Sequence, residues 1–289
     1  MSHGNEIKTI GVIGAGFMGA ELAYVATVSG FNVLMKDANM ELAEKGKQKI
    51  EYIYNKQISK GRVEKEQMEK GLTLIKLVDT YEGLKDVDFV IEAVSEDIKL
   101  KAKVHQDLDK VCPEHCIIAS NTSNISITKL AAATHRPDRF IGMHFFSPAR
   151  VMKLVEVIPG METSDKTMSI TLELAGKMGK EPVKLKNECV GFIVNRLLQI
   201  FEDEAIALVE EGVASVEDID KAVKLGLGHP MGPFELMDFT GMQLQLDSSE
   251  IMFAEYGERY IPRPLLRRMV SAGRFGIKAG KGWYDYPEK

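Results

Sequence analysis

One histidine of this chain has the surroundings that a proton-transferring side chain needs. His144 closes the apolar run 140–144, Phe-Ile-Gly-Met-His, which predicts a strand of a sheet. In open α/β folds the ligand crevice lies outside the carboxyl ends of the strands, so a side chain there can reach a bound molecule. An imidazole at that position can accept and return a proton near neutral pH. A hydrogen-bonded structural histidine is the alternative interpretation.

Two polar residues follow other predicted strands in the same way. Glu96 comes just after the apolar run 88–94, and Ser123 just after the run 116–120. Because ligand-contacting groups gather at the carboxyl ends of the strands, we expect both to be candidates together with His144. His105 falls in a charged helical segment, where we expect it to be solvated. The other histidines lie at the N-terminus, in polar connections or in a turn: His3, His115, His135 and His229.

A glycine-rich turn near the start of the chain predicts a dinucleotide site. An apolar run leads into Gly14-Ala-Gly16-Phe-Met-Gly19, and a segment with apolar residues at helical spacing follows. Between a strand and a helix, the first glycine allows the tight turn and the second lets a pyrophosphate approach the backbone. The third lets helix and strand pack closely. A second apolar run ends at Asp37, 18 residues after Gly19, about where a carboxylate meets the adenosine ribose. A glycine-rich turn of some other α/β protein is the alternative.

The remaining pattern predicts the elements that position these residues. Up to about residue 187, apolar runs of strand length alternate with segments of helical periodicity, which favours a Rossmann-type, doubly wound, mainly parallel sheet. We predict an α/β domain at 1–187 and an all-helical domain at 188–289. Further predicted strands are 72–77, 154–158 and 183–185. The predicted helices include 98–111, 165–178, 193–212, 215–225, 233–253 and 262–272.

Composition argues against several classes of protein. The 289 residues carry a formal net charge of −5, which gives no electrostatic case for nucleic acid or an acidic membrane. The three cysteines give no disulfide framework, and Cys112-Pro-Glu-His-Cys116 has neither zinc nor haem spacing, so no metal is expected. No signal-peptide pattern opens the chain. These features favour a cytoplasmic protein, although a mitochondrial protein without its transit peptide would look the same.

Several longer stretches carry a family resemblance along nearly the whole chain. In order they are Gly-Ala-Gly-Phe-Met-Gly, Ala-Ser-Asn-Thr-Ser, Ile-Gly-Met-His-Phe-Phe-Ser-Pro, Val-Met-Lys-Leu-Val-Glu-Val-Ile, Gly-Phe-Ile-Val-Asn-Arg, Ala-Ser-Val-Glu-Asp-Ile-Asp, His-Pro-Met-Gly-Pro-Phe-Glu-Leu and Gly-Lys-Gly-Trp-Tyr-Asp-Tyr. On these stretches the sequence resembles the short-chain 3-hydroxyacyl-CoA dehydrogenases, and most of all the bacterial 3-hydroxybutyryl-CoA dehydrogenases.

The resemblance implies an oxidoreductase that interconverts (S)-3-hydroxybutyryl-CoA and acetoacetyl-CoA by hydride transfer to or from NAD. In the matching positions His144 is the acid/base and Glu156 is the carboxylate paired with it. On physical grounds too, a charge inside the apolar run Leu-Val-Glu156-Val-Ile needs a partner. Ser123 and Asn195 match the polar residues around the reacting oxygen and the thioester.

The resemblance also implies which residues hold the two nucleotide-containing molecules. Asp37 favours NAD over NADP, because a carboxylate repels a 2′-phosphate, although the neighbouring Lys36 could tolerate one. The implied cofactor-binding residues are Gly14, Gly16, Phe17, Met18, Gly19, Asp37, Glu96, Lys101, Ser123, Ser147 and Lys278. The implied CoA-substrate residues are Ser123, Lys56, Lys60 and Asn195; a solvated basic helix end is the alternative for the lysines.

Two other functions remain open from the sequence. One is a non-catalytic, crystallin-like NAD-binding scaffold, and the other is a hydroxy-acid dehydrogenase of the 3-hydroxyisobutyrate type. The His144 and Glu156 pair argues against both. A homodimer formed by the helical domain is implied by the resemblance, and no nucleic-acid or membrane partner is expected.

Overall fold

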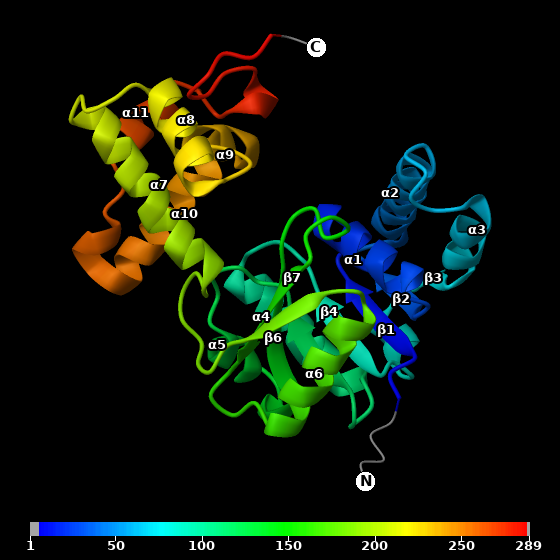
Figure 1. The fold of residues 1–289 in the computed structure, drawn as a ribbon. Helices are drawn as coiled ribbons and strands as arrows, with labels where there is room; N and C mark the ends of the chain where they lie inside the picture. Colours follow the sequence, from blue (N-terminus) through cyan, green and yellow to red (C-terminus); the bar gives the residue numbers. More distant parts are fainter. Residues whose placement is uncertain (1–5, 288–289) are drawn as a thin grey trace. The chain divides into compact units, whose positions relative to one another are not determined.

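The computed structural model describes residues 6–287. The chain folds into two compact units, Met1–Cys189 and Val190–Lys289, which we call the sheet unit and the helical unit (Figure 1). The division lies two residues beyond the one at 187 that the sequence predicts. Within residues 6–287, no helix has the length and apolar character that crossing a bilayer requires.

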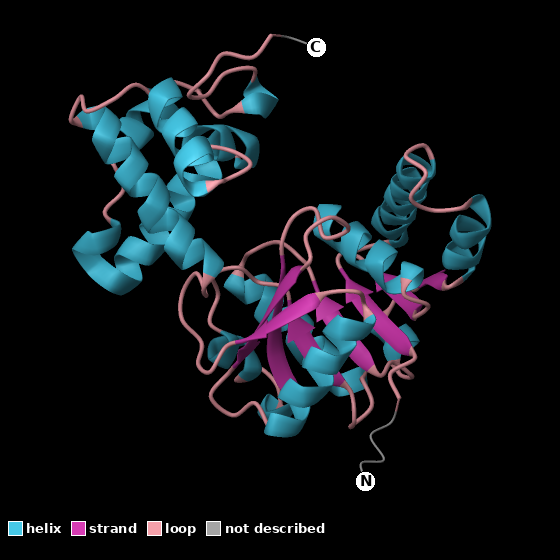
Figure 2. Ribbon diagram, viewed as in Figure 1, coloured by secondary structure: helices cyan, strands magenta, loops and turns pink. Residues whose placement is uncertain are grey.

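The sheet unit is built on a single mixed sheet. Within the described residues, eight strands pair in the order β3-β2-β1-β4-β5-β6-β7-β8 (Figure 2). Neighbouring strands run parallel, except that β6 and β7 are antiparallel. The predicted doubly wound, mainly parallel sheet is therefore confirmed. The strands are β1 (Thr9–Ile13), β2 (Asn32–Lys36), β3 (Ile75–Leu77), β4 (Phe89–Glu92), β5 (Ile117–Ser120), β6 (Phe140–Phe145), β7 (Leu154–Pro159) and β8 (Glu181–Lys184).

Helices flank this sheet, which explains the almost wholly apolar central strands. Ile10, Val12 and Ile91 are completely buried in one continuous core. These central strands therefore read as mainly apolar runs in the sequence. The helical elements of the sheet unit are α1 (Phe17–Val28), α2 (Met40–Ile58), α3 (Lys65–Thr73), η1 (Tyr81–Leu84), α4 (Ile98–Val111), α5 (Ile127–Ala131), η2 (Pro137–Arg139) and α6 (Asp165–Lys177).

The helical unit has a separate core formed by residues such as Ile206, Phe234 and Leu266. Its pairing of extended backbone, within the described residues, is limited to two isolated bridges, Gly276 with Lys281 and Lys281 with Asp285. The predicted helical character is confirmed. The elements are α7 (Val194–Glu210), α8 (Val216–Leu227), α9 (Pro233–Thr240), α10 (Met242–Tyr256), η3 (Gly257–Tyr260), α11 (Pro264–Ser271) and η4 (Ile277–Ala279).

Two predicted elements have the wrong extent. The predicted strand 72–77 is a strand only from Ile75, because α3 continues to Thr73. The predicted helical piece 233–253 is two helices, α9 and α10, that meet at Gly241. The φ angle of Gly241 is 107°, which an L side chain rarely adopts and which ends α9.

The helical unit buries two neighbouring carboxyl groups on α7. Glu202 and Asp203 are almost completely buried, and one oxygen of each has no hydrogen-bond partner among the described residues. Burial raises the pKa of Glu202 well above its usual value, and the charge of Asp203 raises it further. Burial also raises the pKa of Asp203, to about 6, although Gln199 donates a hydrogen bond to it at 3.2 Å. Near neutral pH the ionised, buried carboxyl group of Asp203 therefore lowers the stability of the protein.

The variant Asp203→Asn is expected to stabilise the protein at pH 7 and to lose this advantage at pH 4. An acid with a raised folded-state pKa stabilises fully below its unfolded pKa, here 3.8, and that contribution is lost as the pH rises through about 6. The gap between the two pKa values corresponds to at most about 3 kcal/mol. Urea unfolding at both pH values measures the effect. Glu204→Gln, on the exposed face of the same helix, is the control. A loss of stability at pH 7 would contradict the assignment.

Candidate functional site

The three glycines of the first turn have distinct packing. Gly14 has a φ angle of 96°, and a Cβ on it would lie 2.6 Å from the carbonyl oxygen of Ala93. A Cβ on Gly19 would overlap the carbonyl oxygen of Gly14. At Gly16, by contrast, no heavy atom of the described residues other than Gly16 and its two chain neighbours lies within 4 Å of the Cβ position. Two glycines therefore pack the turn and helix against the sheet, and the third leaves open space beside the backbone.

This turn fits the pyrophosphate of a dinucleotide. Gly16 precedes the first residue of α1, and no side chain of the described chain caps that end of the helix. The first N–H groups of a helix attract anions, because they lack partners within the helix. The exposed side chain of Phe17 follows directly, with the half-buried Met18 after it. An open, uncapped helix start is the arrangement that the sequence predicts for phosphate binding.

A pocket of about 360 Å³ lies between this turn and the end of β2. Asp37 lines it and is held by two backbone N–H groups, those of Ala15 and Ala38, each at 2.6 Å. The ammonium group of Lys36 donates to the carbonyl oxygen of Asp37 at 2.8 Å and lies 4.6 Å from the ring centre of Tyr81. The lining is completed by apolar side chains suited to a flat base, among them Val94, Leu100 and Val104.

His144 and Glu156 form a buried pair across two strands. They are direct partners in the antiparallel ladder between β6 and β7, which places both side chains on the same face of the sheet. His144 Nδ1 lies 2.8 Å from Glu156 Oε2. The predicted need of Glu156 for a partner inside its apolar strand is thus met. With Nδ1 facing the carboxylate, Nε2 is the ring nitrogen that faces the other side of the site.

Ser123 completes a line of polar contacts with this pair. Its hydroxyl oxygen lies 3.1 Å from His144 Nε2. The turn that carries Ser123 is fixed by Glu96, whose Oε1 accepts hydrogen bonds from the N–H groups of Ser123 at 2.9 Å and Asn124 at 3.2 Å. The Thr122 hydroxyl donates to the same oxygen. The structure therefore brings together Glu96, Ser123 and His144, the three residues that the sequence places after strand ends.

Lys101 and His105 are buried on α4 instead of facing solvent. Lys101 is only 1% exposed, and its ammonium group contacts Glu92 and Glu96. The prediction that His105 is solvated is wrong. It is completely buried, packs edge-on against the ring of Phe140, and places Nε2 3.2 Å from Glu92 Oε2. The charged pattern of α4 hid this, because the inner face of the helix carries charged residues as well as apolar ones.

Glu92, the last residue of β4, was not among the residues predicted from the sequence. It is fully buried and ionised. Burial raises its pKa, but His105 and Lys101 outweigh burial and hold the pKa at about 2. The signal was present in the sequence, because Glu92 interrupts an apolar run just as Glu156 does. A buried charge in a strand needs a partner, and here the partner comes from the next helix.

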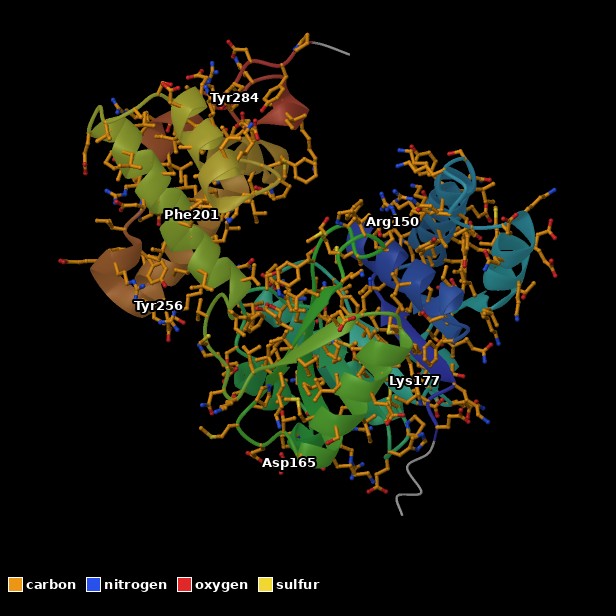
Figure 3. All side chains as sticks on the ribbon, viewed as in Figure 1. Arg150, Asp165, Lys177, Phe201, Tyr256 and Tyr284 are labelled. Carbon is orange, nitrogen blue, oxygen red and sulfur yellow. The ribbon has the colours of Figure 1, made fainter. Side chains whose placement is uncertain are left out.

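The loop after β6 is anchored from two sides. The buried carboxylate of Glu21 on α1 binds the guanidinium group and the backbone N–H of Arg150, which lies on the loop beside α1 (Figure 3). The ammonium group of Lys180 donates to the carbonyl oxygens of Ala149 and Met152. Ser147 is exposed on this loop. Both anchors, Glu21 and Lys180, also went unnoticed in the sequence, because neither stands in a recognisable motif.

The remaining predicted site residues are exposed or half-buried side chains on helices or at their ends. Lys56 and Lys60 are exposed at the end of α2, and the Lys56 ammonium group lies 4.8 Å from the ring centre of Tyr52. Asn195 is the second residue of α7 and is half-buried, and Lys278 is exposed on η4; both belong to the helical unit. No three His, Cys, Asp or Glu side chains within residues 6–287 are grouped so that they could hold a metal ion.

Comparison with known proteins assigns both units to one family. A family model described as 3-hydroxyacyl-CoA dehydrogenase, NAD binding domain, matches residues 9–189. The model for the C-terminal domain of the same family matches residues 191–286.

Individual relatives match over nearly their full length. A probable 3-hydroxybutyryl-CoA dehydrogenase of Bacillus subtilis is 45% identical over 98% of this chain and 99% of its own. The human mitochondrial hydroxyacyl-coenzyme A dehydrogenase is 43% identical over 97% of this chain and 91% of its own. The crystal structure of an (S)-3-hydroxybutyryl-CoA dehydrogenase from Ralstonia eutropha has a TM-score of 0.94 at 43% identity. The match covers 98% of this chain and 100% of that one.

Alanine at Gly19 and alanine at Gly16 are expected to have different effects. Gly19→Ala forces a methyl group against the Gly14 carbonyl oxygen and should lower the free energy of unfolding by about 1–3 kcal/mol or more. Gly16→Ala should leave the unfolding free energy within about 0.5 kcal/mol of the parent and weaken NADH binding instead. Chemical denaturation and NADH fluorescence titration measure the two effects. Unchanged NADH affinity in Gly16→Ala would contradict the assigned role of this turn.

Proposed function

The chain belongs to the 3-hydroxyacyl-CoA dehydrogenase family, and from this premise we propose that it interconverts (S)-3-hydroxybutyryl-CoA and acetoacetyl-CoA with NAD. The family is an NAD-dependent one, and the glycine turn and Asp37 pocket fit that cofactor. The short four-carbon substrate is supported by the bacterial relatives, which are named 3-hydroxybutyryl-CoA dehydrogenases. The observation that carries the chemistry is the buried His144–Glu156 pair with Ser123 against Nε2.

His144, Glu156 and Ser123 have different roles in this reaction. His144 Nε2 takes the hydroxyl proton of the alcohol in oxidation and returns it to the ketone oxygen in reduction. Glu156 holds the ring through Nδ1 and compensates the charge of the imidazolium that forms. The hydroxyl group of Ser123 binds the same substrate oxygen. The chemistry that bound NAD supplies is hydride transfer to or from C3 of the substrate.

Further contacts follow from the family. We assign Lys56 and Lys60 to the phosphates of CoA, because ammonium groups at an exposed helix end attract phosphorylated ligands. Ser147 and Lys278 are assigned to the cofactor. A homodimer through the helical unit is supported by its large exposed apolar side chains, including Leu197, Leu225 and Leu244, which are 60–78% exposed. A cytoplasmic location stays a prediction; the relatives include bacterial and mitochondrial proteins.

Acetoacetyl-CoA reduction followed at 340 nm tests the reaction and its acid/base together. We expect rapid loss of NADH with the parent protein and a reduction of kcat by about 10²–10⁴-fold in His144→Gln, since a glutamine can hydrogen-bond but not transfer a proton. His135→Gln, which changes a histidine whose side chain is 98% exposed, should keep parental kcat. Tight NADH binding without turnover would instead favour the crystallin-like scaffold. Turnover of a free hydroxy acid alone would favour the hydroxyisobutyrate type.

Asn195→Ala tests the predicted contribution of the helical unit. If the amide binds the thioester or reacting oxygen, kcat for acetoacetyl-CoA should fall by about 10²-fold while the Kd of NADH stays unchanged. Gln243→Ala removes an exposed amide of the same unit and serves as the matched control. Steady-state kinetics and NADH titration separate the two quantities. Parental kcat in Asn195→Ala would remove this residue from the site.

A further inference from the structure

Both oxygens of the Glu92 carboxylate contact donor groups of neighbouring residues. Its Oε1 accepts hydrogen bonds from the backbone N–H of Val94 and from Lys101 Nζ, both at 2.7 Å. Its Oε2 accepts one from the Ser120 hydroxyl at 2.7 Å and lies 3.2 Å from His105 Nε2. Glu92 is fully buried in the sheet unit, so it cannot itself touch a substrate. Any effect of its charge on a bound substrate must therefore pass through the residues that contact it.

Lys101 links the buried carboxylate of Glu92 to the exposed carboxylate of Glu96. In the described chain the ammonium group of Lys101 donates two hydrogen bonds and forms an ion pair with a third oxygen. The three oxygens are Glu92 Oε1 at 2.7 Å, the carbonyl oxygen of Val94 at 3.2 Å and Glu96 Oε2 at 3.3 Å. Two of the three anchor the ammonium group to the end of β4. The third fixes one oxygen of Glu96.

Glu96 then uses its other oxygen to hold the catalytic turn. Its Oε2 faces Lys101, while Oε1 accepts hydrogen bonds from the backbone of Ser123 and Asn124 and from the Thr122 hydroxyl. Rotation of this carboxylate would release all of these bonds together. The position of the Ser123 hydroxyl against His144 Nε2 at 3.1 Å thus depends on Glu96.

We propose that Glu92 is a positioning residue, which acts through Lys101 and Glu96 to set the Ser123 hydroxyl against His144. The proposal rests on the function proposed above and goes beyond it, because it assigns a role in catalysis to a buried group outside the site. Glutamine at position 92 keeps the shape but presents an NH₂ group and loses the charge. In the described chain Glu96 is then the one carboxylate left beside Lys101, so the ammonium group is drawn toward it and the carboxylate that holds the Ser123 turn shifts.

A double-mutant cycle between Glu92→Gln and Ser123→Ala tests the route of this effect. In the parental background Glu92→Gln should lower kcat by about 10- to 100-fold, since small displacements in a site cost this much. In the Ser123→Ala background it should lower kcat less than about twofold, because the group it positions is gone. An equal loss in both backgrounds, or a loss confined to NADH affinity, would overturn the proposal.

The control is Asp109→Asn, which alters another buried, ion-paired carboxylate on the same helix as Lys101. Asp109 binds Arg136 and His135. In the described chain it has no hydrogen bond or ion pair with Glu92, Lys101, Glu96 or Ser123. It should lower stability but keep parental kcat. Ser120→Ala is a milder second variant, which removes one donor to Glu92 and an acceptor 3.4 Å from the N–H of Thr122, and it should act in the same direction as Glu92→Gln.

A measurement without turnover separates this proposal from the proposed reaction. In ¹⁵N spectra of labelled histidine, Ser123→Ala should shift the His144 Nε2 resonance, and Glu92→Gln and Ser120→Ala should shift it in the same direction. Asp109→Asn should leave it at the parental position. A parental His144 resonance in both Glu92→Gln and Ser120→Ala overturns the positioning role, whatever the enzyme turns over. An inactive parent protein would overturn the reaction alone.

Discussion

The site depends on one cross-strand pair, His144 against Glu156. A carboxylate in the middle of a buried strand is tolerated only with a partner, and the antiparallel register supplies one directly opposite. Because the two residues face each other in the ladder, the backbone hydrogen bonds of β6 and β7 determine their separation. The pair is thereby held by two hydrogen-bonded strands of the sheet, while Glu96 and Ser123 lie in turns that follow other strands.

Those turns are held by charged side chains, of which Glu21 and Lys180 are buried and Glu96 is exposed. Glu96 fixes the turn of Ser123, and Glu21 and Lys180 fix the loop that follows β6. Each charge binds backbone groups, which would otherwise be unsatisfied in a half-buried loop. The sheet unit thus uses charged side chains that bind backbone groups, in place of apolar packing, to hold these loops.

The sequence was informative wherever local chemistry decides the structure. The glycine turn, Asp37 and the strand ends carrying Glu96, Ser123 and His144 followed from motif and position. The antiparallel step to β7 could not be seen, since a buried strand is apolar in either direction. Gly241 was hidden between two helical patterns. His105 and Glu92 were misjudged or missed, because their burial depends on which face of α4 and which end of β4 meet, and that is a tertiary property.

The ladder between β6 and β7 fixes positions 144 and 156 by main-chain bonds, independently of what side chains stand there. The scaffold therefore sets where the two side chains lie, whatever residues occupy these positions. In evolution or in redesign, another pair of interacting side chains could be installed at these two positions and would start from a correct separation. The chemistry of these two positions could then change while the fold stays the same.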